Sequence, residues 1–265
     1  MATALIAADD PHVGIHQRTT RGSGRWRWLA GMSLRPILLG AVLLALYLWV
    51  QTQTLDSIEK RSLNSHEVQV EFWQHVQLSL VATAITIAIA VPLGILLTRS
   101  FARWIKPIGL GLGNLGQAIP SIGLIVLLAL WLGIGFWTAA IGLVAYSALP
   151  ILRNTIVGLE GVDPALKEAA RGMGMSRLAV LGRVELPLAV PVILAGVRTA
   201  LVLTVATATL ATFIGAGGLG GGLVAGINLN RPSLSVTFGV LAAVLALFAD
   251  WVGGIAEELL RPRGI

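Results

Sequence analysis

The sequence predicts an all-α protein that crosses a membrane about six times. Of its 265 residues, 55% are hydrophobic and only 12% are charged, whereas a soluble domain carries about a quarter charged residues. The mean hydropathy is +0.82. These values exclude an ordinary water-soluble fold and a disordered chain.

Six apolar runs are long enough to be membrane spans. A spanning helix needs about 20 apolar residues to cross about 30 Å of hydrocarbon. The predicted spans are 34–52, 74–98, 112–132, 136–153, 188–213 and 235–257. They define a transmembrane domain over 34–257, with a tail before it at 1–33 and another after it at 258–265.

The basic residues predict the orientation of these spans. With the N-terminus inside, fifteen Lys and Arg fall in inner segments and three fall in outer segments, namely Lys60, Arg61 and Arg231. Cytoplasmic loops carry an excess of Lys and Arg. We therefore expect both tails to be cytoplasmic, which requires an even number of spans. The net charge of +6 is explained by orientation and does not indicate nucleic-acid binding.

The cytoplasmic segment 158–187 is too polar to lie in lipid and reads as a helix–turn–helix. Asp163 is a helix N-cap, and Ser176 can cap a second short helix. Gly172 and Gly174 can supply the left-handed stop to the first helix. The second helix should end at or before Pro187, because proline lacks the N–H that a helix interior needs. Its place between spans favours a protein-docking role over DNA binding.

The same segment carries a spaced motif, E-A-A-x3-G-x9-I-x-L-P, with valine in place of isoleucine. Its members are Glu168, Ala169, Ala170, Gly174, Val184, Leu186 and Pro187. The motif resembles the coupling signature of permeases of ATP-binding-cassette (ABC) importers. The resemblance implies a MetI-like fold in the bacterial inner membrane, with this loop seated on a cytoplasmic ATPase.

Residue types at these positions suit docking. Glu168 offers a carboxylate, and Ala169 and Ala170 would let a partner surface approach closely. Gly174 permits a turn that a side chain would block.

Other segments resemble permeases for osmoprotectants such as glycine betaine, choline and carnitine. They are QAIPS at 117–121, LPILRNT at 149–155 and EAARGMGMSR at 168–177. A permease for an amino acid such as methionine remains an alternative. A secondary transporter is an alternative of another class, although intramembrane charge is sparse for it.

The resemblance also implies the partners. They are cytoplasmic ABC ATPases, a second permease subunit that is identical or different, and an extracytoplasmic solute-binding protein, with lipid around the helices. ATP and Mg²⁺ would belong to the ATPase, since this chain has no phosphate-loop motif. We expect no cofactor, metal or catalytic residue in this chain: it has no cysteine, and its four histidines lack metal-ligand spacing.

Three further features carry hypotheses. Gln117, Pro120 and Ser121 either line the solute pathway or mark an ordinary proline kink. Arg198 and Asp250, the charges deep within spans, either pair across the fifth and sixth spans or reach separately to the inner interface. The glycine-rich segment 215–220 is expected to be a flexible outer loop near the site where the binding protein docks.

Overall fold

The computed structural model describes residues 23–260, and these contain helices and no strand. The long helices are α1 (Ser23–Gln51), α3 (Ser65–Leu97), α6 (Phe136–Glu160), α9 (Leu186–Ala208) and α11 (Pro232–Leu260). The shorter ones are α2 (Ser57–Ser62), α4 (Lys106–Ala118), α5 (Ser121–Leu132), α7 (Pro164–Gly172), α8 (Arg177–Val180) and α10 (Gly220–Asn228). Three helical turns complete the chain: η1 (Arg103–Ile105), η2 (Leu181–Glu185, a π-helical turn) and η3 (Thr209–Ile214).

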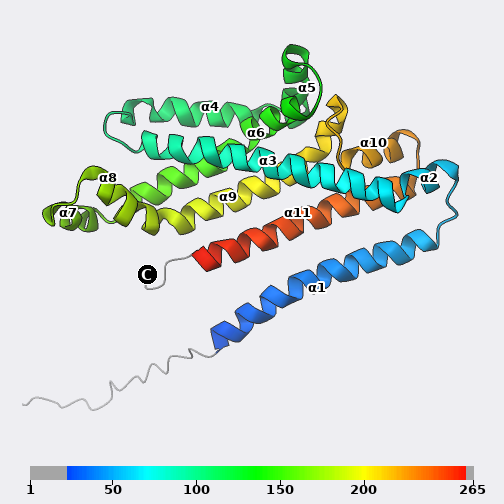
Figure 1. The fold of residues 1–265 in the computed structure, drawn as a ribbon, viewed down its shortest axis with the longest axis horizontal. Coiled ribbons are helices and arrows are strands. Elements are labelled where there is room, and N and C mark those ends of the chain that lie inside the picture. Colours follow the sequence, from blue (N-terminus) through cyan, green and yellow to red (C-terminus); the bar gives the residue numbers. More distant parts are fainter. Residues whose placement is uncertain (1–22, 261–265) are drawn as a thin grey trace, which may run out of the picture.

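The long helices run roughly side by side, and the short ones gather at the two ends of the bundle (Figure 1). The start of α1, the end of α11 and helices α7 and α8 lie at one end, while α2, α5 and α10 lie towards the other. We call the first the cytoplasmic end, following the distribution of basic residues, and the second the outer end. Because the described chain starts and finishes at the same end, it crosses the bundle an even number of times.

The predicted third span, 112–132, is broken rather than a single helix. Helices α4 and α5 meet at a bend of 99°. Lys106, which begins α4, pairs with Glu160 at the end of α6 (Nζ–Oε2 2.6 Å), so α4 starts at the cytoplasmic end. Ile125 of α5 belongs to an apolar cluster that includes Ala211 of η3, at the outer end. The bent pair therefore connects the two ends of the bundle. Together with the five long helices it gives the described chain six crossings.

The bend has a local cause in Pro120. Proline disfavours the helical conformation of the residue before it, and Ile119 is extended there, with φ −72° and ψ 130°.

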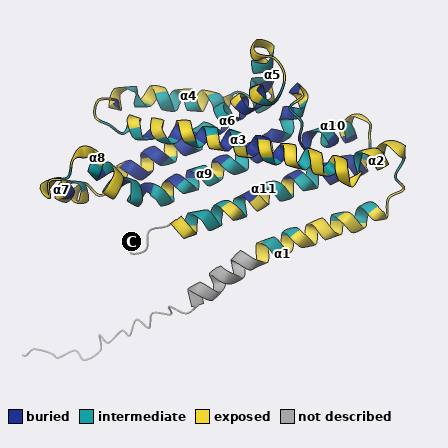
Figure 2. Cartoon of the chain, in the orientation of Figure 1, coloured by how far each residue is buried: buried dark blue, intermediate teal, exposed yellow. Residues whose placement is uncertain are grey.

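The core lies between α3, α6 and α9, where most buried residues gather (Figure 2). Glycines allow α6 and α9 to approach closely: a Cβ on Gly196 would lie 2.8 Å from the Pro150 carbonyl oxygen, and one on Gly158 would lie 3.1 Å from that of Ala189. Small residues at such contacts are typical of packed membrane helices. By contrast, residues 34–51 of α1 are mostly exposed, and the helix packs chiefly on α11.

Several predicted boundaries differ from the structure. Residues 23–33, predicted as part of the tail, belong to α1, and residues 65–73 extend α3 beyond the predicted span. Helix α6 continues to Glu160 rather than ending at 153. In each case the extra helical residues include polar ones, which a hydropathy criterion leaves out although a helix can project beyond the lipid. The tail residues 1–22 and 261–265 lie outside the described residues.

Candidate functional site

Helix α7 is defined by local signals at both ends. The Asp163 side chain accepts a hydrogen bond from the Ala165 N–H (2.8 Å), and the chain leaves the helix through Gly174, whose φ is +83°. The Gly174 N–H donates to Arg171 O and the Met175 N–H donates to Ala170 O. This pair of hydrogen bonds is a Schellman motif, with glycine at its left-handed position. Gly174 therefore has the role in the turn that the sequence predicted.

The second helix of the loop ends at Val180, before Pro187 as predicted, but the chain stays helical from there into the next span. Ser176 caps α8 by accepting from the Ala179 N–H (3.3 Å), but α8 then passes through η2 directly into α9. The Leu186 N–H bonds to Leu181 O, the i−5 spacing of a π-helix. This wider turn directly precedes Pro187, so the local hydrogen-bond pattern differs from that of an α-helix just where proline supplies no donor.

We call residues 164–185 (α7, the Gly174 turn, α8 and η2) the coupling unit. Among the residues of the spaced motif, Glu168 and Ala169 are exposed, Val184 is half-buried, and so are Leu186 and Pro187 at the start of α9. Ala170 is 2% exposed. It therefore packs inside this chain and cannot face a partner in this structure, in contrast to the sequence-based expectation.

The exposed side of the coupling unit also carries large apolar side chains. Met173 and Leu178 are 72% and 80% exposed, and Leu166 is about half exposed. Apolar residues beside a carboxylate at the cytoplasmic end form a surface suited to a protein partner.

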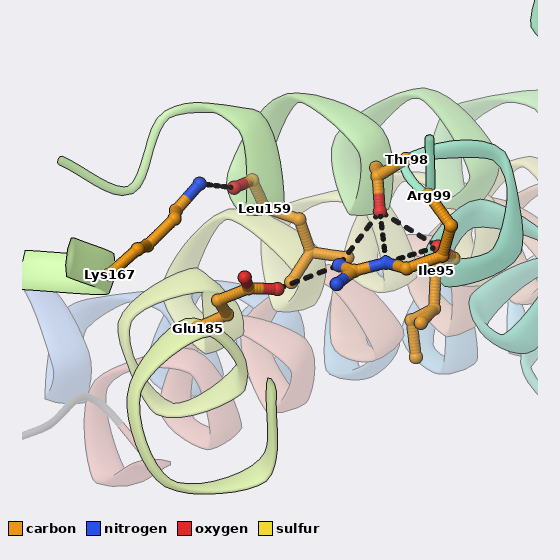
Figure 3. A network of polar contacts seen from close by, with 6 residues as sticks. All are labelled: Ile95, Thr98, Arg99, Leu159, Lys167 and Glu185. Atoms are coloured by element: carbon orange, nitrogen blue, oxygen red, sulfur yellow. Dashed lines mark hydrogen bonds and ion pairs between the residues drawn. The ribbon is translucent and has the colours of Figure 1, made fainter. Parts of the chain in front are cut away.

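Two polar contacts fix the coupling unit to the ends of membrane helices (Figure 3). The Lys167 ammonium donates to Leu159 O near the end of α6 (3.1 Å). Arg99, just after α3, donates from Nη2 to Glu185 Oε2 (2.7 Å) and from Nε to Ile95 O (3.3 Å). Cations at helix C-termini are favourable, because unpaired carbonyls point there.

Arg99 and Glu185 were not identified by the sequence analysis. The available signal was that Glu185 is a single carboxylate inside the otherwise apolar run VELPLAVPVILAG, where an unpaired charge would be costly.

The proposed pathway residues lie at the α4–α5 bend. Gln117 and Ser121 are half-buried and Pro120 is exposed. Three residues before Gln117, the Asn114 side chain of α4 accepts a hydrogen bond from Arg153 of α6 (2.9 Å). Irregular backbone at membrane depth is tolerated where it lines a cavity or contacts protein; in this structure the bend is partly uncovered.

Arg198 and Asp250 are brought together across α9 and α11. The guanidinium donates to both carboxylate oxygens, at 2.6 and 2.7 Å. Arg35 of α1 lies 3.3 Å from Asp250 and Glu257 lies 3.5 Å from Arg198, so two cations and two carboxylates join three helices. Gly253 and Gly254 leave room for the arginine, since a Cβ on either would contact it.

The glycine-rich outer segment is packed against the bundle rather than open, which corrects the expectation of a flexible loop. We call residues 215–231 the outer corner. The Gly218 N–H donates to the Gln74 side chain (3.1 Å), and the Gly222 N–H donates to Glu71 (3.2 Å). Leu219 between them is fully buried.

Helix α2 closes the outer corner. Arg231 pairs with Asp56 (2.5 Å), and Ser233 of α11 donates a hydrogen bond to Glu59. That hydroxyl, with the Asp56 N–H, lowers the pKa of the Glu59 carboxyl below its ordinary value. Among residues 23–260 there is no cluster of three or more side chains able to hold a metal ion.

Comparison with known proteins identifies the family. Residues 90–262 match the family described as "Binding-protein-dependent transport system inner membrane component". The chain is 42% identical to the carnitine transport permease protein OpuCB of Listeria monocytogenes, over 76% of this chain and 92% of that protein. It is 40% identical to the choline transport system permease protein OpuBB of Bacillus subtilis, with the same coverage.

A solved structure supports the fold independently. The inward-facing MetNI methionine ABC transporter matches with a TM-score of 0.63 and 23% identity, over 74% of this chain and 96% of that chain. The α-helical membrane fold that the sequence predicted is thereby confirmed. Given the family match over residues 90–262, this chain belongs to the binding-protein-dependent transport system inner membrane components.

Proposed function

We propose that this chain is the membrane permease of an ABC importer for osmoprotectants of the glycine betaine, choline and carnitine class. The observation that carries the proposal is the coupling unit, which presents Glu168, Ala169 and exposed apolar side chains at the cytoplasmic end. The names of the relatives at about 40% identity support the cargo class.

The coupling unit is the docking surface for a cytoplasmic ATPase in this proposal. ATP and Mg²⁺ bind to the ATPase, and this chain makes and breaks no covalent bond. Closure of the ATPases moves the coupling unit and exchanges two arrangements of the helices, because ATP favours one arrangement over the other.

The solute pathway lies at the α4–α5 bend, shared with a second permease subunit that is identical or homologous. Gln117, Pro120 and Ser121 contribute to its wall. An extracytoplasmic binding protein delivers the solute and supplies most of the selectivity.

Affinity purification of the tagged chain from its native membrane, with identification of co-purified proteins, tests the partners. We expect an ABC ATPase and a solute-binding protein. Recovery without any ATPase would overturn the proposal.

Uptake of labelled glycine betaine in cells that do and do not express the chain tests the cargo. We expect uptake that stops on ATP depletion and that excess choline or carnitine reduces. Competition by methionine alone would assign the amino-acid alternative, and uptake that survives ATP depletion would indicate a secondary transporter.

One substitution tests the coupling unit itself. We expect Gly174→Asp to insert normally into the membrane but to lose ATPase association, because aspartate is strained at φ +83°. The matched control is Gly182→Asp, in the same unit, where added atoms meet open space and φ is ordinary. Equal association of the two variants with the ATPase would contradict the docking role of the turn.

A further inference from the structure

The coupling unit has a single ion pair to a distant helix within the described residues. Arg99 follows α3, and Glu185 ends η2, 86 positions later in the chain. The other ion pairs in the described part of the chain join Arg35, Arg198, Lys106 and Arg231 to carboxylates outside residues 164–185.

This pair is built to persist. The Glu185 side chain is only 6% exposed, and the apolar cluster at this end includes Leu181 and Leu186 on either side of it, with Ile95 of α3. Separating a buried carboxylate from its cation is strongly unfavourable. Arg99 is itself held by Ile95 O and the Thr98 hydroxyl (2.9 Å) (Figure 3).

Helix α3 extends from this joint to the outer end of the bundle without interruption over 33 residues. At its far end, Glu71 and Gln74 hold the backbone of the outer corner. Pro92 lies within α3 and supplies no N–H, but α3 remains one helix. A displacement applied at Glu185 therefore has a direct route along α3 to the opposite surface.

We propose that the Arg99–Glu185 ion pair is the joint that passes movement of the coupling unit to α3 and, through α3, to the outer corner. Arg99 and Glu185 are positioning residues of the transport cycle, since they act through other elements and need not touch solute or ATP. This inference rests on the proposed function, because it requires an ATPase on the coupling unit.

The test uses the whole importer in proteoliposomes, with its ATPase and binding protein, and glycine betaine as the probe. The readout is solute moved per ATP hydrolysed. We expect Glu185→Gln to lower this ratio about tenfold while ATPase association persists; coupling between sites is typically worth roughly 5- to 150-fold. A purely structural defect would lower assembly, and with it both activities in proportion.

A matched control and a double variant make the result decisive. Glu160→Gln removes the neighbouring ion pair to Lys106, and we expect a wild-type ratio. Arg99→Gln combined with Glu185→Gln leaves no unpaired buried charge, so it should fold, and its ratio should match that of Glu185→Gln alone because one joint is lost in both. Losses that multiply in the double variant would overturn the inference.

The chain has no cysteine, which permits a second measurement. A Cβ added at Gly221 would make only ordinary contact with Glu71, so we choose this position for a cysteine. In the Gly221→Cys background, we expect a non-hydrolysable ATP analogue to change labelling by a membrane-impermeant thiol reagent, and Glu185→Gln to abolish that change.

Two failures can be told apart. If the wild-type chain recruits no ATPase, the proposed function falls and this inference falls with it. If the wild-type complex transports and Glu185→Gln keeps both the transport ratio and the labelling response, only the joint is wrong.

Discussion

The coupling unit and the outer corner both connect transmembrane helices and both contain left-handed glycines, but only the outer corner also needs glycine for close packing. In the coupling unit, Gly174 has positive φ and open space where a Cβ would be, so it serves backbone conformation alone. In the outer corner, Gly215, Gly217 and Gly218 also have positive φ, but Gly220 and Gly222 have ordinary φ and no room, because a Cβ would overlap Thr209 O or the Phe238 ring. The coupling unit is shaped by local signals and leaves its surface free, whereas the outer corner adds close packing to such signals and buries part of its surface.

The largest expected effect comes from filling the tight contact in the outer corner. Gly220→Ala would force a methyl group into the Thr209 carbonyl, which is backbone and cannot rotate away. We expect about 3 kcal/mol of destabilisation, the upper end of what overpacking usually costs. Thermal unfolding of the purified protein measures it.

The matched control for that prediction is Gly221→Ala, the adjacent glycine. Its Cβ would lie 3.4 Å from Glu71 Oε1, an ordinary contact, so stability should change little. Equal melting temperatures for the two variants would show that the outer corner is not closely packed.

The next effect tests the coupling unit through backbone conformation. Gly174→Ala should destabilise the fold by about 1–2 kcal/mol, because an L-residue is strained in the left-handed conformation. We expect this destabilisation to be confined to α7. Gly172→Ala, in the helix and also in open space, should be neutral or stabilising by up to about 1 kcal/mol. Hydrogen exchange across 164–175 measures both, and we expect faster exchange in the first variant only.

These two regions also show what the sequence could and could not predict. The α7 cap at Asp163 and the turn at Gly174 were predictable, because caps and left-handed glycines depend on residues a few positions apart. The packing of the outer corner was not, since Gln74 and Gly218 are 144 positions apart and glycine-rich composition alone resembles a loop. The spaced motif that located the coupling unit is also local, because all its members lie within residues 168–187.

Other gaps in the prediction had the same physical origin. The second helix of the loop ends before Pro187 as expected, but the π-helical turn that carries the chain on into α9 has no simple sequence signal. The hypothesis that Arg198 and Asp250 pair is confirmed, but only the tertiary contact could decide between it and the alternative that each reaches separately to the interface. Glu185 was passed over because its partner Arg99 lies in the turn after α3, 86 residues away in the sequence.

A smaller effect is expected from the exposed apolar surface of the coupling unit. Leu178→Ser should change the stability of the isolated chain by less than about 0.5 kcal/mol, because Leu178 is 80% exposed. If the ATPase covers this side chain, its affinity should fall by about 1 kcal/mol, since truncating a central apolar contact costs that much or more. Titration of purified ATPase onto the reconstituted permease measures it, and unchanged affinity would remove Leu178 from the docking surface.

The smallest expected effect is a pH dependence at the outer corner. The Ser233 hydroxyl and the Asp56 N–H lower the pKa of Glu59 below its ordinary value of 4.5. A carboxyl with a lowered pKa in the folded state stabilises the protein fully above its ordinary pKa, and the contribution is lost as pH falls through the lowered value. The melting-temperature difference between wild type and Glu59→Gln should therefore be constant near neutral pH and shrink below about pH 4.5.

Ser233→Ala should lose the same pH-dependent stabilisation, because it removes the donor that lowers the pKa of Glu59. The control is Ser235→Ala, which should keep the wild-type pH profile. Among the described contacts, the Ser235 hydroxyl touches only the Arg231 carbonyl. A melting-temperature difference that stays constant down to pH 3 would mean that Glu59 does not depend on its ionised form. The outer corner would then be held by its packing, by its hydrogen bonds to Gln74 and Glu71 and by the Arg231–Asp56 pair, with no contribution from the charge of Glu59.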